Sequence, residues 1–235
     1  MKRICICFLW MAFFTTGCTS KPVIPHDYRL FLKYMPKSIL VLPPANQSME
    51  VMAPYMYLST ITRPLAEKGY YVYPVAVIDA LMKENGLTSP EEMHQIPLHK
   101  INEVIHPDAV LYLTIKDWGT KYKLIDSQTS IAIYGKLVDT ESGITIWQKE
   151  RKIVRSSTDN ADSIEKMLIA ALVNQVLSNF VDPSLDVAQR INQDMYNNPQ
   201  NGLLLGKYHP LYEENQKNWR QKMEDAYQKK NKMNR

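Results

Sequence analysis

The sequence predicts an α/β fold with an α+β tendency: a mixed sheet with a parallel βαβ N-terminal half, an antiparallel meander and C-terminal helices. Two observations predict it. Strand-like apolar runs alternate with segments of helical spacing up to about residue 118, which is typical of parallel strands joined by helices. Beyond that point, two strand patterns flank the turn Asp139–Gly143, which is typical of an antiparallel hairpin.

Three strands with intervening helices make up the parallel half. The continuous apolar run Ile39–Leu42 is stopped by two prolines and suits a strand that is buried on both faces. A polar loop is expected from Ala45 to Glu50. The other strands are expected at 70–75 and 108–118. Helices are expected at 28–35, 53–68, 75–85 and 97–105, and Pro64 is expected to kink or divide the second of them.

The second half of the chain is expected to add a meander and helices. Residues 131–137 alternate between two faces of a strand, with Ile131, Ile133, Gly135 and Leu137 on one side. The returning strand is expected at 144–154. A long amphipathic helix follows from about 161 to 180, and Pro183 begins another that runs to about residue 196.

The N-terminus has the pattern of an exported lipoprotein. A positive start is followed by the apolar run Ile4–Phe14, about half of the roughly 20 residues that a membrane span needs. Such a run is typical of a signal peptide over residues 1–17. The small residues before Cys18 resemble the lipobox of bacterial lipoproteins, with Thr15 where leucine is usual. We expect acylation of Cys18, with chains such as palmitate; a buried N-terminal helix is the alternative.

Cysteine usage agrees with a lipid anchor. Cys5 and Cys7 lie in the segment that would be removed, so Cys18 would have no partner for an intramolecular disulfide. Residues 18–25 would be a tether stiffened by prolines. Since the aspartate that retains lipoproteins in the inner membrane is absent after Cys18, we expect the periplasmic face of the outer membrane. Surface exposure stays open.

Charge gives no sign of a nucleic-acid partner. The chain has 28 Lys and Arg against 24 Asp and Glu, and removal of residues 1–17 takes away two of the basic residues. The basic excess lies in an extension over residues 207–235, where a helix is expected at 212–230. One face of this helix has a stripe of large side chains. Either the helix packs this stripe on the domain, or it docks on a partner or on anionic lipid headgroups. The stripe consists of Trp219, Met223 and Tyr227.

No pattern of catalytic residues is present. The sequence lacks a G-x-S-x-G elbow and a glycine-rich phosphate loop. His94, His99 and His106, together with Glu91 and Glu92, form the only cluster worth weighing as a metal site. Their gaps of five and seven do not match the three or four that ligands on one helix need. We expect no metal, no cofactor and no enzyme activity.

A methionine-rich loop is the first candidate for a binding surface. It leaves the C-terminal end of the predicted strand at residues 39–42, where open α/β sheets place ligands. Methionine and aromatic side chains suit adaptable interfaces, although ordinary packing is the simpler explanation for any one of them. The candidate residues are Met49, Met52, Tyr55, Met56, Trp118 and Tyr122.

Five motifs carry a resemblance that spans most of the chain between Cys18 and Pro210. They are SILVLPP, GYYVYPV, AVLYLTIKDWGTKY, KLVDTESGITIWQ and NGLLLGKYHP. In order and spacing they resemble an outer-membrane lipoprotein family of unestablished activity that includes a meningococcal surface-antigen lipoprotein. The resemblance implies an α/β domain, here residues 26–206, similar to the N-terminal domain of TolB. It also implies a homodimer and partners among secretion-channel or transporter lipoproteins.

The residues and the resemblance together favour a non-enzymatic role. We expect a lipid-anchored periplasmic accessory lipoprotein that acts by protein–protein contact in outer-membrane secretion or transport assembly. The alternative is a binding module for a small envelope ligand, a lipid or a peptidoglycan fragment. An envelope hydrolase of unrecognised type is a third reading.

Overall fold

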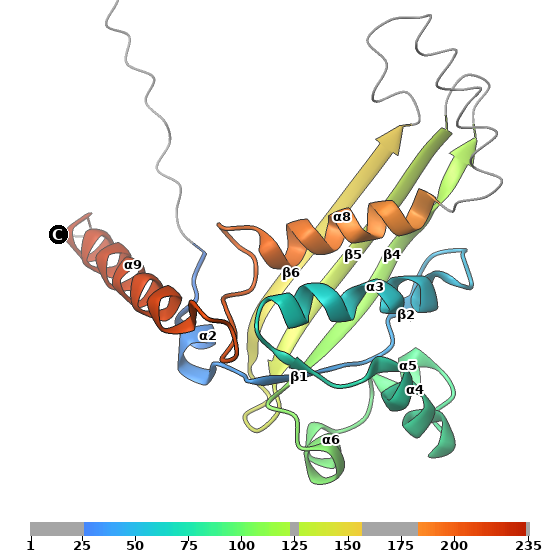
Figure 1. Ribbon diagram of the computed structural model, residues 1–235, viewed down its shortest axis with the longest axis horizontal. Coiled ribbons are helices and arrows are strands. Elements are labelled where there is room, and N and C mark those ends of the chain that lie inside the picture. Colours follow the sequence, from blue (N-terminus) through green and yellow to red (C-terminus); the bar gives the residue numbers. More distant parts are fainter. Residues whose placement is uncertain (1–25, 123–126, 157–182, 234–235) are drawn as a thin grey trace, which may run out of the picture.

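One mixed six-stranded sheet runs through the computed structural model, which describes residues 26–122, 127–156 and 183–233 (Figure 1). The spatial order is β3-β1-β4-β5-β6, and β2 also pairs with β4. β1 is parallel to β3 and β4, whereas β4, β5 and β6 are antiparallel neighbours, so the predicted fold class is confirmed. The strands are β1 (Ser38–Val41), β2 (Ala45–Asn46), β3 (Tyr71–Val72), β4 (Ala109–Tyr122), β5 (Ser127–Asp139) and β6 (Thr145–Ser156).

Each helix expected within the described residues is present. The helices are α2 (Arg29–Tyr34), α3 (Ala53–Glu67), α4 (Val75–Glu84), α5 (Pro90–Met93), α6 (Leu98–Ile105), α8 (Pro183–Asn197) and α9 (Tyr212–Met233). The helix expected at 161–180 lies outside the described residues. One expectation was wrong in part: the segment from Ala45 to Glu50 is not entirely a loop, because its first two residues form β2 against β4.

Helices cover the sheet on both faces. Ile39 and Val41 of β1 point into the larger core, which α3 and α8 complete on one face of the sheet. Leu40 and Leu42 point the other way, into a smaller core under α4, α5 and α6. This division explains the uninterrupted apolar run, because a strand covered on both faces has no solvent side for polar residues. In Figure 1 the three small helices lie together at one end of the sheet.

Pro64 lies inside α3, which continues from Ala53 to Glu67, so the helix is not divided there. A proline in a helix removes one backbone N–H, which leaves the carbonyl four residues earlier without its usual donor. That carbonyl belongs to Thr60, and the side-chain Nδ2 of Asn192 on α8 donates to it at 3.1 Å and to the Thr60 hydroxyl at 2.8 Å. The buried amide therefore supplies the missing donor and joins α8 to α3.

The NGLLLGKYHP motif crosses the C-terminal end of α3 so closely that the two backbones form hydrogen bonds with each other. Gly206 N donates to Lys68 O at 2.7 Å, and Tyr208 N donates to Gly69 O at 3.0 Å. A Cβ atom on Gly206 would lie 2.5 Å from the carbonyl oxygen of Gly69, so both crossing segments need glycine. Tyr70 adds a buried hydrogen bond from its hydroxyl to Leu204 O at 2.7 Å.

The C-terminal helix α9 packs on α2 at one end of the molecule (Figure 1). Trp219 is buried there, with its ring edge-on to Tyr28 at 4.6 Å between centroids. Arg220 adds a hydrogen bond to Leu32 O at 3.1 Å. Further along the stripe, Tyr227 is exposed, so only the first half of the predicted stripe is covered. Among the described residues, no helix combines the length and the apolarity needed to cross a membrane.

Candidate functional site

Four large apolar side chains are exposed between β2 and the first turns of α3. We call Met49, Val51, Met52 and Tyr55 the loop patch. Their exposed fractions are 97%, 79%, 54% and 48%. Single exposed apolar residues are common on protein surfaces, but a group of four within seven positions is typical of a surface that a partner covers.

Hydrogen bonds hold the backbone of the patch in one conformation. Gln47 N donates to Ile115 O at 2.8 Å, which ties the loop to β4. The Asn46 side chain accepts from Ser48 N at 3.0 Å and donates to Glu50 O at 2.8 Å. Glu50 N donates to Ser48 Oγ at 3.3 Å. Because polar side chains fix the loop from below, its apolar side chains are presented to solvent with little conformational freedom left to lose on binding.

Tyr55 is positioned by a neighbouring helix. Lys83 on α4 lies over its ring, 5.0 Å from the centroid, and donates to its hydroxyl at 3.1 Å. The same ammonium group is 2.6 Å from Asp79. The hydrogen bonds that Lys83 donates to Asp79 and to Tyr55 raise the pKa of Lys83, so the group stays charged. The edge of the patch therefore carries an ion pair, and its centre is apolar.

The structure corrects part of the predicted surface. Trp118 is 5% exposed and belongs to the larger core, where its ring lies edge-on to Tyr57 at 6.4 Å. The cause is a β-bulge between Ile115 and Asp117, after which Trp118 stands opposite Ile131 on the core face. Met56 is half-buried against the same core and contributes little to the patch.

Two residues of the predicted sites, Tyr122 and Cys18, lie partly or wholly outside the part of the chain that the structure describes. Tyr122 ends β4, where its backbone pairs with Ser127, but its side chain lies outside the described part of the structure. Cys18 also lies outside the described residues. Of the six predicted surface residues, the structure therefore brings Met49, Met52 and Tyr55 together. It adds Val51, which the sequence analysis missed although it stands between two of them.

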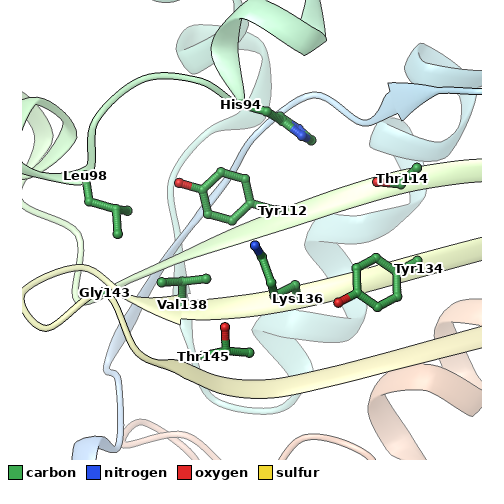
Figure 2. A pocket seen from close by; sticks show the side chains of 9 residues that line it. All are labelled: His94, Leu98, Tyr112, Thr114, Tyr134, Lys136, Val138, Gly143 and Thr145. Carbon is green, nitrogen blue, oxygen red and sulfur yellow. The ribbon is translucent and has the colours of Figure 1, made fainter.

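A second feature, a trough, lies on the sheet face that α4, α5 and α6 cover only in part. It has a volume of about 350 Å³ and opens to solvent above β4, β5 and β6. Figure 2 shows side chains rising from the strands on one side and His94 and Leu98 closing the other. The trough was not expected from the sequence, although the alternation over residues 131–137 puts Tyr134 and Lys136 on the face opposite Ile131 and Ile133. The lining residues are His94, Leu98, Tyr112, Thr114, Tyr134, Lys136, Val138, Gly143 and Thr145.

One lysine supplies the positive charge of the trough. Lys136 stands opposite Tyr112 in the sheet, and its Nζ lies 5.2 Å from the centre of that ring. Burial raises the pKa of Tyr112, so its hydroxyl stays protonated and can donate a hydrogen bond. Next to the trough, Lys116 is 2.5 Å from Glu150, which neutralises that lysine.

His94 adds a neutral wall. The pKa of His94 is lowered, chiefly by burial and further by the nearby charge of Lys136. The hydrogen bond to Pro43 and the charge of Glu91 act in the opposite direction but are outweighed. Its Nε2 lies 2.9 Å from Pro43 O, and since a carbonyl oxygen only accepts, this nitrogen carries the proton. The ring also stands edge-on to Tyr112 at 5.4 Å between centroids. The remaining nitrogen, Nδ1, is therefore an unprotonated acceptor.

Neither feature resembles a metal centre. Across residues 26–122, 127–156 and 183–233, no three His, Cys, Asp or Glu side chains are grouped so that they could hold a metal ion. The loop patch offers exposed apolar surface, and the trough offers polar groups around one ammonium group.

Comparisons with known proteins agree with the motifs and the fold and point to a class of envelope lipoproteins. A family model that describes GNA1162-like lipoproteins matches residues 26–208 of the chain. This match covers most of the chain, and the chain therefore belongs to the GNA1162-like lipoprotein family. The resemblance expected from the sequence is confirmed.

Two relatives illustrate the likeness. Lipoprotein NMB1124/NMB1162 of Neisseria meningitidis serogroup B is 32% identical over 192 residues, which are 81% of this chain and 89% of the relative. The crystal structure of lipoprotein GNA1162 from Neisseria meningitidis is 36% identical, with a TM-score of 0.51, and the match covers 61% of this chain and 99% of that one. The likeness extends to the fold of the α/β domain.

Proposed function

We propose that this lipoprotein is a lipid-anchored accessory that works through protein–protein contact in an outer-membrane secretion or transport assembly. In this proposal, residues 1–17 are removed, Cys18 carries the acyl chains, and residues 18–25 tether the domain to the periplasmic face of the outer membrane. Two or three acyl chains hold such a protein stably, since each buried CH₂ contributes about 0.8 kcal/mol.

The loop patch is the observation that carries the proposal. Its four apolar side chains are exposed, while a network of hydrogen bonds fixes the backbone that presents them. Flexible loops lose affinity when they become ordered on binding, whereas a fixed loop keeps most of the energy of its contacts. Tyrosine and methionine are also enriched in protein interfaces. The partner is a lipoprotein of the same assembly, and a second copy of the chain completes a homodimer.

A pair of valines allows a controlled test. Val51 in the patch and Val104 on α6 are both well exposed, at 79% and 68%, and they lie on different elements. Val51→Asp places a charge at the centre of the proposed interface, whereas Val104→Asp makes the same chemical change elsewhere. Intact cells are crosslinked, the envelope is solubilised in mild detergent, and the proteins that co-purify with each variant are identified.

The proposal expects a defined partner with the wild type and with Val104→Asp. Val51→Asp is expected to reduce its recovery at least tenfold, because a buried unpaired charge in an interface costs several kcal/mol. Cys18→Ser is expected to lose both the partner and the membrane. Equal recovery with both aspartate variants would show that the loop patch is not the contact surface.

A further inference from the structure

The trough on the open face of the sheet has a chemistry that the proposed contact role does not use. Its residues are separate from those of the loop patch, so the two can be tested independently. The question is which ligand a site with one ammonium group, two tyrosine rings and several hydroxyl groups would accept.

Its charge is unbalanced. None of the lining residues is an aspartate or a glutamate, and Lys136 has no carboxylate partner among the described residues. Two carboxylates near the trough have partners of their own: Glu150 is paired with Lys116, and Glu91 accepts a hydrogen bond from Asn46 N. Burial lowers the pKa of His94, which favours its neutral form, so Lys136 is the charged group of the lining. A half-buried ammonium group with no carboxylate among the residues that line the trough is matched best by an anion from outside the protein.

The walls define the rest of the ligand. Tyr112 and Tyr134 stand on neighbouring strands of the same sheet face, two residues apart along the ladder, with Lys136 beside them. A lysine ammonium group lies over each ring, Lys136 over Tyr112 and Lys116 over Tyr134, and the parts of the rings that line the trough are flat and apolar. The hydroxyls of Thr114 and Thr145 lie in the same lining. A volume of about 350 Å³ is at the lower end of the range for ligand pockets, which suits a single ring with substituents.

We propose that the trough binds an acidic sugar, with the carboxylate at Lys136 and the sugar ring across Tyr112 and Tyr134. A sugar ring has apolar C–H faces that pack on tyrosine rings and hydroxyl groups that pair with threonine and tyrosine hydroxyls. The carboxylate forms a charge-assisted hydrogen bond with Lys136. Such bonds are shorter and stronger than neutral ones, so Lys136 sets the preference for acidic over neutral sugars.

Two monosaccharides that differ in one acidic group provide the test. N-acetylmuramic acid carries a lactyl carboxylate that N-acetylglucosamine lacks. Binding of each to the full-length protein in mild detergent is followed by ligand-observed NMR titration. The proposal expects N-acetylmuramic acid to bind about tenfold more tightly, which is the usual effect of one hydrogen bond to a charged group.

Substitutions assign the effect to the residue. Lys136→Met removes the charge but keeps an unbranched side chain of nearly the same length, and it is expected to remove the preference. Lys136→Arg is expected to keep it. Lys100→Met on α6 removes the same charge from an exposed pair with Glu103 and is expected to change affinity less than twofold. Thermal unfolding of each variant checks that it is folded.

Three results would overturn the inference: equal binding of the two sugars, no binding of either up to millimolar concentrations, or an unchanged preference in folded Lys136→Met. Each of these leaves the proposed partner contact intact, because that role depends on Val51 and its neighbours. Conversely, loss of the partner in Val51→Asp does not affect the trough.

Discussion

Two glycines with the same backbone conformation test how the closing motif holds the domain together. Gly69 follows α3 with φ of 84°, and Gly86 follows α4 with φ of 85°. Their surroundings differ: a Cβ at Gly69 would lie 2.3 Å from the backbone nitrogen of His209, whereas at Gly86 it would meet nothing within 4 Å. Alanine at the two sites therefore has the same backbone strain and different steric consequences.

The expected costs follow from this difference. The left-handed conformation costs an alanine about 1–2 kcal/mol at either site. At Gly69 the segment around His209 must also move, and overpacking of this kind costs about 1–3 kcal/mol more. Such a movement strains the hydrogen bonds from Gly206 N to Lys68 O and from Tyr208 N to Gly69 O, each worth about 1 kcal/mol.

Thermal unfolding of the full-length variants measures the difference directly. For a chain of this size, 1 kcal/mol corresponds to a shift of about 2–4 °C, so Gly69→Ala should unfold roughly 2–12 °C below Gly86→Ala. Gly206→Ala should resemble Gly69→Ala, because its Cβ would lie 2.5 Å from the Gly69 carbonyl oxygen. If Gly69→Ala and Gly86→Ala unfold at the same temperature, the backbone crossing does not have the structural role assigned to it.

Three further predictions concern the core, the α3–α8 contact and pH. Trp118→Ala should lower the free energy of unfolding, measured in urea, by about 3–5 kcal/mol, as for a buried tryptophan. A change below about 1 kcal/mol would contradict the burial of this side chain in the core. Asn192→Ala should lower the free energy of unfolding by about 1–3 kcal/mol. The loss should be smaller when Pro64→Ala is also present, because residue 64 then has an N–H that can donate to Thr60 O; additive losses would contradict this. The pKa of His94, measured by NMR, should lie below the usual value of 6.5. The unfolded state then binds more protons than the folded state at acidic pH, so the contribution of His94 to the free energy of unfolding should fall as the pH drops below about 6.5. A pKa above 6.5 would contradict the burial argument.

Much of the fold could be predicted because local patterns and tertiary packing agree. The run Ile39–Leu42 is apolar on both faces because both faces are covered, and this is visible in the sequence. The helical spacing of α3 and the glycine at its end gave its bounds to within a residue. The turn Asp139–Gly143 gave the hairpin of β5 and β6, because Asp139 and Gly143 have the side chain and the backbone freedom that the turn requires.

Other features depend on contacts that no local pattern reports. The bulge near Asp117 reverses the face of the residues that follow, so Trp118 is in the core although simple alternation would place it outside. Pro64 leaves Thr60 O without its usual donor within α3, and Asn192 supplies one from a helix far along the chain. The trough depends on which part of the sheet the small helices leave uncovered, and the alternation around Lys136 gives no information about this.

The contact role of the loop patch is most directly tested by a photo-crosslinking amino acid placed at residue 51 in living cells. Residue 104, also an exposed valine, is the matched position away from the patch. The account predicts one discrete adduct from residue 51, none from residue 104, and loss of the adduct when Cys18→Ser removes the anchor. Adducts of equal yield from both positions, or none from residue 51, would contradict a partner contact through the loop patch.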